Sequence, residues 1–192
     1  MMLTKHLKVR VFFIISILIL SLQTWTRADD ISNFEIDGIS VGDSLLDYLS
    51  IKEIKKNIMD YYVDGEFVAV EINSKLENFD GIQVHYKKNS NYIIHSVDGV
   101  FMIKNLNECM AKIKEIKNEF KKIFVNADKG DWDREPMFSK MGYIHGSYYY
   151  LNSGDFAEVS CYEYTRSDYA NNGRVSIYTK EFDKWLNTVR YK

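Results

Sequence analysis

The sequence predicts a two-layer α+β domain in which helices cover one face of an antiparallel sheet. Two groups of three segments show the alternation of polar and apolar residues that is typical of strands, with turn residues between them. Three segments with apolar residues three or four positions apart precede, separate and follow these groups. The predicted order is therefore helix, three strands, helix, three strands, helix.

The first helical region is predicted between about residues 44 and 59. Ser44 is followed three positions later by Asp47, and Ser50 by Glu53, a spacing typical of the capping boxes at which helices begin. This pattern indicates either two short helices or one kinked helix.

The first group of strands is predicted at residues 67–72, 81–87 and 92–103. We expect Val84 to lie opposite His95, because this register gathers the apolar side chains on one face, whereas a slip by one residue would scatter them. That face would hold Ile82, Val84, Tyr86, Ile93 and Val97.

The clearest element is a long helix that begins after Asn105, with Glu108 at the reciprocal capping position. Its apolar stripe comprises Leu106, Cys109, Met110, Ile113, Ile116, Phe120, Ile123 and Phe124. The five lysines of its opposite face (Lys112, Lys114, Lys117, Lys121 and Lys122) are interpreted as a solvated surface rather than a binding stripe. Residues 125–141, which contain the single proline Pro136, are predicted to form a polar loop.

The second group of strands is predicted at about 142–151, 156–165 and 173–179, with turns at residues 152–155 and 171–173. A closing helix follows, with Thr179 as its cap. Its buried stripe is expected to comprise Phe182, Trp185, Leu186 and Val189.

The N-terminus has the order of features of a secretory signal peptide. Residues 1–10 carry three basic and no acidic residues, and an apolar run over 11–22 follows. A membrane-spanning helix needs roughly 20 apolar residues, so this run is short for an anchor. Thr26 and Ala28 stand at the −3 and −1 positions of a cleavage site, which predicts a signal peptide of residues 1–28 and one domain at 29–192. An uncleaved anchor is the alternative.

We therefore expect a periplasmic or secreted protein without a stable membrane anchor after cleavage. Residues 1–28 carry four of the 25 basic residues and none of the 27 acidic ones, so residues 29–192 have a formal net charge of −6. Such an acidic chain is not expected to bind nucleic acid. The envelope partners that remain are a protein or a small ligand.

The two cysteines, Cys109 and Cys161, predict a disulfide bond, because paired cysteines in an oxidising compartment usually form one. Cys109 lies on the apolar stripe of the long helix, and Cys161 alternates with small apolar residues of a strand, so both are expected to face the same layer. The alternative is two buried, reduced cysteines.

No metal or other cofactor is expected. The histidines beyond the signal peptide are His85, His95 and His145, and they are not predicted to meet on one face. His95 is expected in the core beside Ile93 and Val97, and His85 on the opposite, polar face beside Gln83. The acids Asp128, Asp131, Asp133 and Glu135 crowd one segment, but their spacing differs from that of an EF-hand, and solvated loops also collect acids.

The sequence contains no motif that identifies a reaction, so no catalytic residue is predicted. Four tyrosines of the second strand group, Tyr148, Tyr150, Tyr162 and Tyr164, could form an aromatic binding face, although tyrosines in strands also serve ordinary packing. We favour a non-catalytic binding or interaction module of the cell envelope. The alternative is an envelope hydrolase whose active site follows no known motif.

Four stretches, NFEIDGISVGDSLLDYLS, GIQVHYKKNSNYIIHSVDGVF, the helix that begins NLNECMAKIKEI, and AEVSCYEY followed by VSIYTKEF, resemble a family of uncharacterised exported proteins from streamlined marine bacteria. The resemblance covers nearly all of residues 29–192 and implies a secreted location and paired cysteines. In addition, GISVGDSLLDYL is similar to the strand-then-helix opening of small two-layer modules of outer-membrane assembly and β-lactamase inhibition. Those assembly modules are typically lipoproteins, and this chain has no cysteine directly behind its apolar run.

Cleavage after Ala28 predicts that the exported protein begins at Asp29. N-terminal sequencing of the form that leaves the cytoplasm should read Asp-Asp-Ile-Ser. Recovery of the intact chain from Met1 in the membrane fraction would instead establish an uncleaved anchor.

Overall fold

The computed structural model describes residues 31–62, 65–72, 78–137 and 141–190. The predicted signal peptide lies outside these residues. Among the helices that are described, none is long and apolar enough to cross a membrane.

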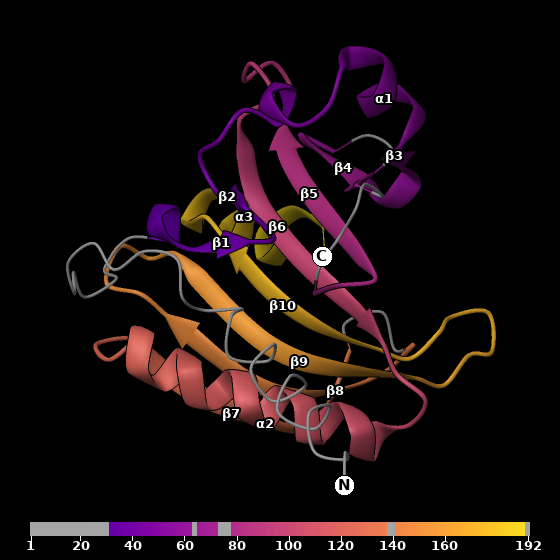
Figure 1. The fold of residues 1–192 in the computed structure, drawn as a ribbon, viewed down its shortest axis with the longest axis vertical. Coiled ribbons are helices and arrows are strands. Elements are labelled where there is room, and N and C mark those ends of the chain that lie inside the picture. The colour runs from indigo at the N-terminus through magenta and orange to yellow at the C-terminus, as the bar shows by residue number, and fades with distance from the viewer. Residues whose placement is uncertain (1–30, 63–64, 73–77, 138–140, 191–192) are drawn as a thin grey trace, which may run out of the picture.

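The main element of the fold is an antiparallel sheet of eight strands in the order β3-β4-β5-β6-β10-β9-β8-β7 (Figure 1). Its strands are β3 (Ile58–Met59), β4 (Phe67–Ile72), β5 (Gly81–Lys87), β6 (Ile94–Met102), β7 (Asp128–Pro136), β8 (Gly142–Tyr150), β9 (Phe156–Tyr164) and β10 (Asn172–Tyr178). The sheet twists strongly, so that β5 and β6 run steeply in Figure 1 while β8 and β9 run across the view.

Three α-helices and a small hairpin accompany the sheet. The helices are α1 (Ile51–Lys56), α2 (Leu106–Ile123) and α3 (Lys180–Trp185), and the hairpin consists of β1 (Glu35–Ile36) and β2 (Ile39–Ser40). Short 3-10 turns lie at Ile31–Asn33, Leu45–Asp47 and Asp60–Tyr62, and a π-helical turn at Leu186–Arg190 extends α3.

The predicted helix caps are confirmed. The Ser50 side chain accepts a hydrogen bond from the Glu53 backbone, and the Glu53 carboxylate accepts one from the Ser50 backbone, which completes the capping box of α1. Asn105 caps α2 and Thr179 caps α3 in the same way, through a side-chain oxygen that accepts from the backbone three positions on. These contacts fix where each helix begins and therefore how it meets the sheet.

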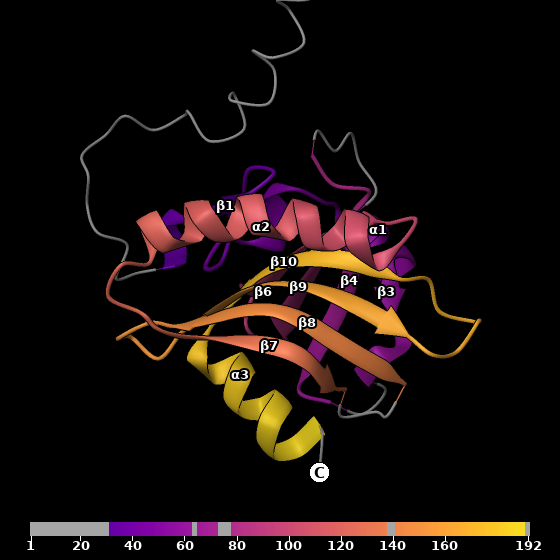
Figure 2. The ribbon, with the colours of Figure 1, turned by 90° about the horizontal axis from the view of Figure 1, so that it is seen from below.

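The helices cover both faces of the sheet, so the prediction that they cover one face is wrong. Figure 2 shows α2 on one side of the sheet and α3 on the other. The reason lies in the strands: in β9, Ala157, Val159 and Cys161 face α2, while Glu158 and Ser160 point to the opposite side, and all five are buried. We call the side that faces α2 the helix face and the opposite side the polar face.

The main hydrophobic core lies on the helix face. It joins the apolar residues of β4, β5, β6, β9 and β10 to α2 and to the segment around β1 and β2. The disulfide bond between Cys109 of α2 and Cys161 of β9, with Cα atoms 6.0 Å apart, ties the helix to the centre of the sheet. The predicted pairing of the two cysteines is thus confirmed.

The predicted apolar stripes of α2 and of the closing helix need small corrections. Met110 of α2 and Val189, beyond α3, were expected to be buried, but both are exposed. Each lies at the margin of its apolar stripe, where the side chain is no longer covered by the sheet.

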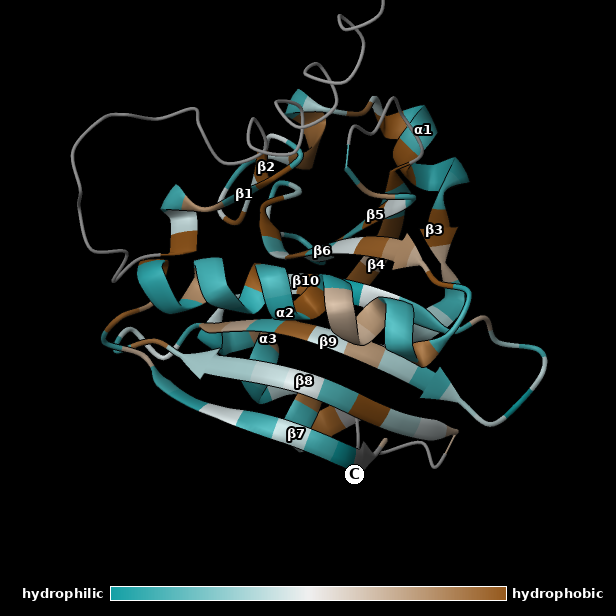
Figure 3. Ribbon diagram, turned by 60° about the horizontal axis from the view of Figure 1, so that its bottom comes forward, coloured by the Kyte–Doolittle hydropathy of each residue, from teal (hydrophilic) through white to brown (hydrophobic). Residues whose placement is uncertain are grey.

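Residues 128–136 form strand β7, whereas the sequence predicted a polar loop here. Figure 3 shows β7 as almost entirely hydrophilic, while hydrophobic and hydrophilic residues alternate along β9. β7 is an edge strand that pairs with β8 alone, so it needs little apolar surface, and Pro136 occupies its last position. The second group therefore has four strands, and the predicted element order is incomplete.

Three further predictions are corrected. Val84 lies opposite Val97 and not His95, an offset of two residues that leaves the same side chains on each face and that alternation therefore does not reveal. A register shift further along, between His85 and Tyr86, brings Ile94, in place of Ile93, to the helix face. The region 44–59 contains a 3-10 turn, α1 and the short strand β3. The 171–173 turn is also shorter than expected, since β10 already begins at Asn172.

Removal of the disulfide bond should destabilise the fold strongly. The bond spans 52 residues, and the entropy that such a loop removes from the unfolded chain corresponds to about 4 kcal/mol. The double variant Cys109→Ala/Cys161→Ala should lose unfolding free energy of this order in urea denaturation, and the reduced wild type should match it. Two reactive thiols per chain in denatured, unreduced protein would contradict the bond.

Candidate functional site

Polar side chains are concentrated on the polar face at the centre of the sheet. Gln83 of β5 lies opposite Asp98 of β6, Asp98 opposite Ser176 of β10, and Ser176 opposite Glu158 of β9. These four side chains thus form one row across four neighbouring strands, and each residue is buried. Buried polar groups are costly unless they are paired, so such a row indicates a functional region rather than a packing layer.

His85 and Asp98 form a close pair at one end of this row. The His85 Nδ1 atom lies 3.3 Å from Oδ2 of Asp98, and its Nε2 atom lies 3.4 Å from the Tyr62 hydroxyl. The imidazole also stacks on the ring of Phe182 from α3. Burial alone would raise the pKa of Asp98, but the His85 imidazole and the Arg174 guanidinium outweigh it and hold this pKa below its ordinary value. Asp98 is therefore ionised at neutral pH.

The pKa of Glu158 is shifted in the opposite direction from that of Asp98. Burial, reinforced by the negative charge of Asp98, raises the pKa of Glu158 to about 7, against the hydrogen bonds and the Arg174 charge that favour ionisation. Its Oε1 atom accepts hydrogen bonds from the Tyr162 hydroxyl at 2.9 Å and from the Ser160 hydroxyl at 3.1 Å. The two carboxyl groups of the row thus differ in protonation near neutral pH.

Arg174 of β10 is the cation at the centre of the polar face, beside the buried row. Its Nε atom donates to Asn172 at 3.1 Å, one terminal nitrogen donates to Gln83 at 3.4 Å, and the guanidinium lies over the Tyr162 ring, 5.0 Å from its centre. Among the described residues, no carboxylate lies within ion-pair distance of it. The pKa of Arg174 is raised, since nearby acidic and phenolic groups outweigh its burial. It is only partly buried and keeps contact with solvent.

The four predicted tyrosines all lie on the polar face, as the pairing of β8 with β9 requires. They form two groups. Tyr162 and Tyr164 have nearly parallel rings with centres 6.4 Å apart and lie beside Arg174. Tyr148 and Tyr150 belong to a separate aromatic cluster with Trp132 and Phe156.

A glycine shapes the second aromatic group. A Cβ atom at Gly130 would lie 2.4 Å from the Tyr148 hydroxyl, so the Tyr148 ring rests directly on the backbone of β7. Tyr150 is 39% exposed, whereas Phe156 beneath it is buried.

Part of the polar face is covered by α3. A second hydrophobic cluster of Phe67, Phe182 and Trp185 packs there, with Tyr62, Tyr178 and Leu186 at its margin. This cover leaves Arg174, Tyr162 and Tyr164 partly exposed.

The predicted histidines do not converge. His85 lies on the polar face, as expected from its neighbour Gln83, but it is buried and not solvated. His95 is not a core residue of the helix face, because its Nδ1 atom lies 3.1 Å from the Thr179 hydroxyl at the start of α3. His145 lies on the helix face, 3.3 Å from Glu163.

The described residues contain no group of three or more histidine, cysteine or carboxylate side chains that could hold a metal ion. The acids of residues 128–135 are spread along β7 instead of gathering in a loop. Asp131 is bonded to Lys117 and Ser147, and these bonds lower its pKa.

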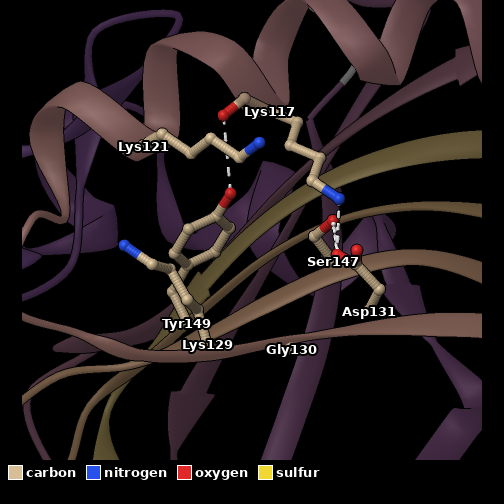
Figure 4. A pocket seen from close by; sticks show the side chains of 7 residues that line it. All are labelled: Lys117, Lys121, Lys129, Gly130, Asp131, Ser147 and Tyr149. Carbon is tan, nitrogen blue, oxygen red and sulfur yellow. Dashed lines mark hydrogen bonds and ion pairs between the residues drawn. The ribbon is translucent and has the colours of Figure 1, made fainter.

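A small pocket of about 170 Å³ lies between α2 and the strands β7 and β8 (Figure 4). Lys117, Lys121 and Lys129 line it, but Lys117 is already paired with Asp131 at 2.5 Å. The Tyr149 hydroxyl donates to the Lys117 carbonyl at 3.4 Å and closes one wall. The cations here are largely exposed or neutralised, so this pocket is a weaker candidate than the polar face.

Sequence reasoning missed the charged members of the polar face: Asp98, Glu158 and Arg174. A signal for them exists, because polar residues alternate with apolar ones in β6, β9 and β10, and strands at the centre of a sheet are covered on both sides. The sequence does not reveal, however, that β6 and β10 are neighbours.

Comparison of the chain with protein-family models, with curated proteins and with solved structures gives no match. The function of this chain is therefore inferred from its own site.

The protonation of Glu158 should be visible in the pH dependence of stability. The unfolded chain releases this proton near its ordinary pKa of 4.5 and the folded chain at about 7, so the free energy of unfolding should fall as pH rises from 5 to 8. The expected loss is on the order of 3 kcal/mol. Asp98 does not offset this loss, because its pKa lies below this pH interval in both the folded and the unfolded chain. The lowered pKa of His95 opposes the loss in part, since its contribution to stability rises with pH in the lower half of the interval.

Glu158→Gln should therefore remove most of this pH dependence in urea denaturation at pH 5 and pH 8. The matched control Glu115→Gln, on the exposed side of α2, should retain it. An equal slope in the wild type and Glu158→Gln would contradict the assigned proton.

Proposed function

We propose that this chain is an exported, non-catalytic binding module of the cell envelope, which holds a small ligand against the polar face of its sheet. The observation that carries this proposal is Arg174, a partly buried guanidinium with no carboxylate within ion-pair distance in the described part of the chain.

An arginine that is held in place, with no carboxylate of the described residues in direct ion-pair contact, is suited to bind an anionic group. Asn172 and Gln83 fix the guanidinium by hydrogen bonds, so little side-chain freedom remains to be lost on binding. The planar fork of the guanidinium favours carboxylate-like or phosphate-like oxygens. The rings of Tyr162 and Tyr164 beside it offer apolar surface with polar tips, which suits a ligand with both kinds of group.

The envelope hydrolase is the second candidate function, and one observation favours it. Glu158 and Asp98 are two carboxyl groups whose environments push their pKa values apart, a pattern that supports acid and base roles. We rank it second because both carboxyl groups are almost fully buried in the row.

Protein-observed NMR with a panel of small anionic and neutral ring compounds would test the binding proposal. The expected result is a set of shift changes confined to β5, β6, β9 and β10. Arg174→Gln should weaken anionic members of the panel at least tenfold, because the charge-assisted hydrogen bonds of the guanidinium are lost. The control Arg166→Gln removes an exposed arginine that is paired with Asp168 and should change nothing.

Shift changes confined to the helix face, or none at all, would contradict the proposal. Slow conversion of an ester in the same samples, lost in both Glu158→Gln and Asp98→Asn, would favour the hydrolase.

A further inference from the structure

The residues around Arg174 indicate which chemical class of ligand the polar face binds. We propose that the polar face binds a monocarboxylate attached to a planar ring, with the carboxylate on Arg174 and the ring against Tyr162 and Tyr164, and that one proton is taken up by Glu158 on binding. This inference deepens the binding function proposed above and depends on it.

The number of free donors on Arg174 favours one small, singly charged group. Its Nε atom and one terminal nitrogen already donate to Asn172 and Gln83, and no hydrogen bond within the described residues uses the second terminal nitrogen. The guanidinium can therefore present one side to a ligand. A carboxylate fits such a side through two oxygens in a plane.

The carboxyl groups of the buried row on the polar face disfavour a ligand that carries two or more negative charges. Asp98 acts on Arg174 as the nearest ionised carboxylate of the row, and Glu158 influences the same guanidinium. A phosphate dianion would add two negative charges beside these acids in a partly desolvated site, where repulsion is weakly screened. A monoanion adds one, which a single proton can balance.

Tyr162 connects the ligand site to the proton site. Its ring lies under the Arg174 guanidinium, and its hydroxyl donates to Oε1 of Glu158. Glu158 also accepts from Ser160, which lies directly opposite Arg174 in the sheet. The Glu158 carboxyl is therefore directed toward the row that holds Arg174, so a new anion there disfavours the ionised form of Glu158.

The charged and titratable groups around Glu158 come from β6, β8, β9, β10 and α3. Asp98 of β6 disfavours the ionised form of Glu158, whereas the Arg174 charge and the hydrogen bonds from Tyr162 and Ser160 favour it. Tyr148 lies opposite Glu158 on β8, Tyr178 of β10 lies within its electrostatic reach, and Asp183 of α3 acts on Tyr178. A carboxylate bound to Arg174 would neutralise the one cation that favours ionisation and would therefore raise the pKa of Glu158 further.

We expect the ligand to contain a planar ring because Tyr162 and Tyr164 lie beside Arg174. Their rings are nearly parallel and both residues are partly exposed, with Arg174 over the Tyr162 ring and Tyr169 stacked on the Tyr164 ring. Tyr61, from the turn between β3 and β4, lies within electrostatic reach of Arg174 and Tyr164 and borders the same space. Aromatic side chains gain most from flat partners that can stack on them or meet their edges.

Isothermal titration calorimetry with benzoate tests this inference. The wild type should bind benzoate, and benzamide, which has the same shape but no charge, should bind at least tenfold more weakly. In two buffers with different ionisation enthalpies at pH 8, the heats should differ by the uptake of close to one proton. From pH 7.5 to 8.5 the affinity should fall close to tenfold.

Two variants separate the parts of the inference. Glu158→Gln should bind benzoate with an affinity that is independent of pH over this range and without proton uptake. Arg174→Gln should lose the preference for benzoate over benzamide. Circular dichroism spectra identical to the wild type would show that both variants fold, and Tyr164→Leu offers a second route by weakening both compounds together.

The outcomes distinguish this inference from the broader function. If neutral rings or inorganic phosphate bind the polar face as tightly as benzoate does, the binding module stands and the carboxylate inference is wrong. If benzoate binds without proton uptake, the role of Glu158 is wrong. If no compound of the NMR panel binds the polar face, both proposals fail.

Discussion

The pairing of β6 with β10 is the interaction on which the rest of the structure depends. It joins two antiparallel groups of strands, one formed by residues 58–102 and the other by residues 128–178, into one sheet through seven residue pairs from Asn172 opposite Met102 to Tyr178 opposite Ser96. Without it, each group would expose one more edge strand and the polar row would be divided between separate sheets. The closeness of Asp98 and Arg174 is a direct result of this seam.

The helix face packs the seam with buried apolar side chains. Val97 and Ile177 lie opposite each other across it and are fully buried, and the disulfide bond anchors α2 on the neighbouring strand β9. This apolar layer allows the other face to carry charged groups at the centre of the sheet. The cost of burying them is distributed over pairs such as His85 with Asp98 and Glu158 with Tyr162.

Local signals in the sequence predicted the local features well. Capping residues placed the starts of α1, α2 and α3, and alternation placed β4, β5, β6, β8, β9 and most of β10. The disulfide bond was also predictable, because Cys109 and Cys161 each carry a recognisable facing in their own element. These predictions depend only on neighbours within a few residues along the chain.

Features that depend on the partners of an element were not predictable in the same way. Strand β7 was missed because an edge strand can be polar on both sides, and α3 was placed on the wrong face because its apolar stripe does not reveal which surface it covers. The charged site was missed for the same reason. Asp98 and Arg174 lie 76 positions apart, and only the sheet order brings them together.

The two outer strands of the sheet have a further consequence, for contacts between chains. β3 contains only two residues, and β7 carries Lys129, Asp131 and Asp133 and ends at Pro136. Short strands, alternating charges and a terminal proline all discourage a strand of another molecule from adding to a sheet. An eight-stranded antiparallel sheet would otherwise offer two long templates for aggregation. The hydrophilic character that hid β7 in the sequence is thus the property that protects the open edge of the sheet.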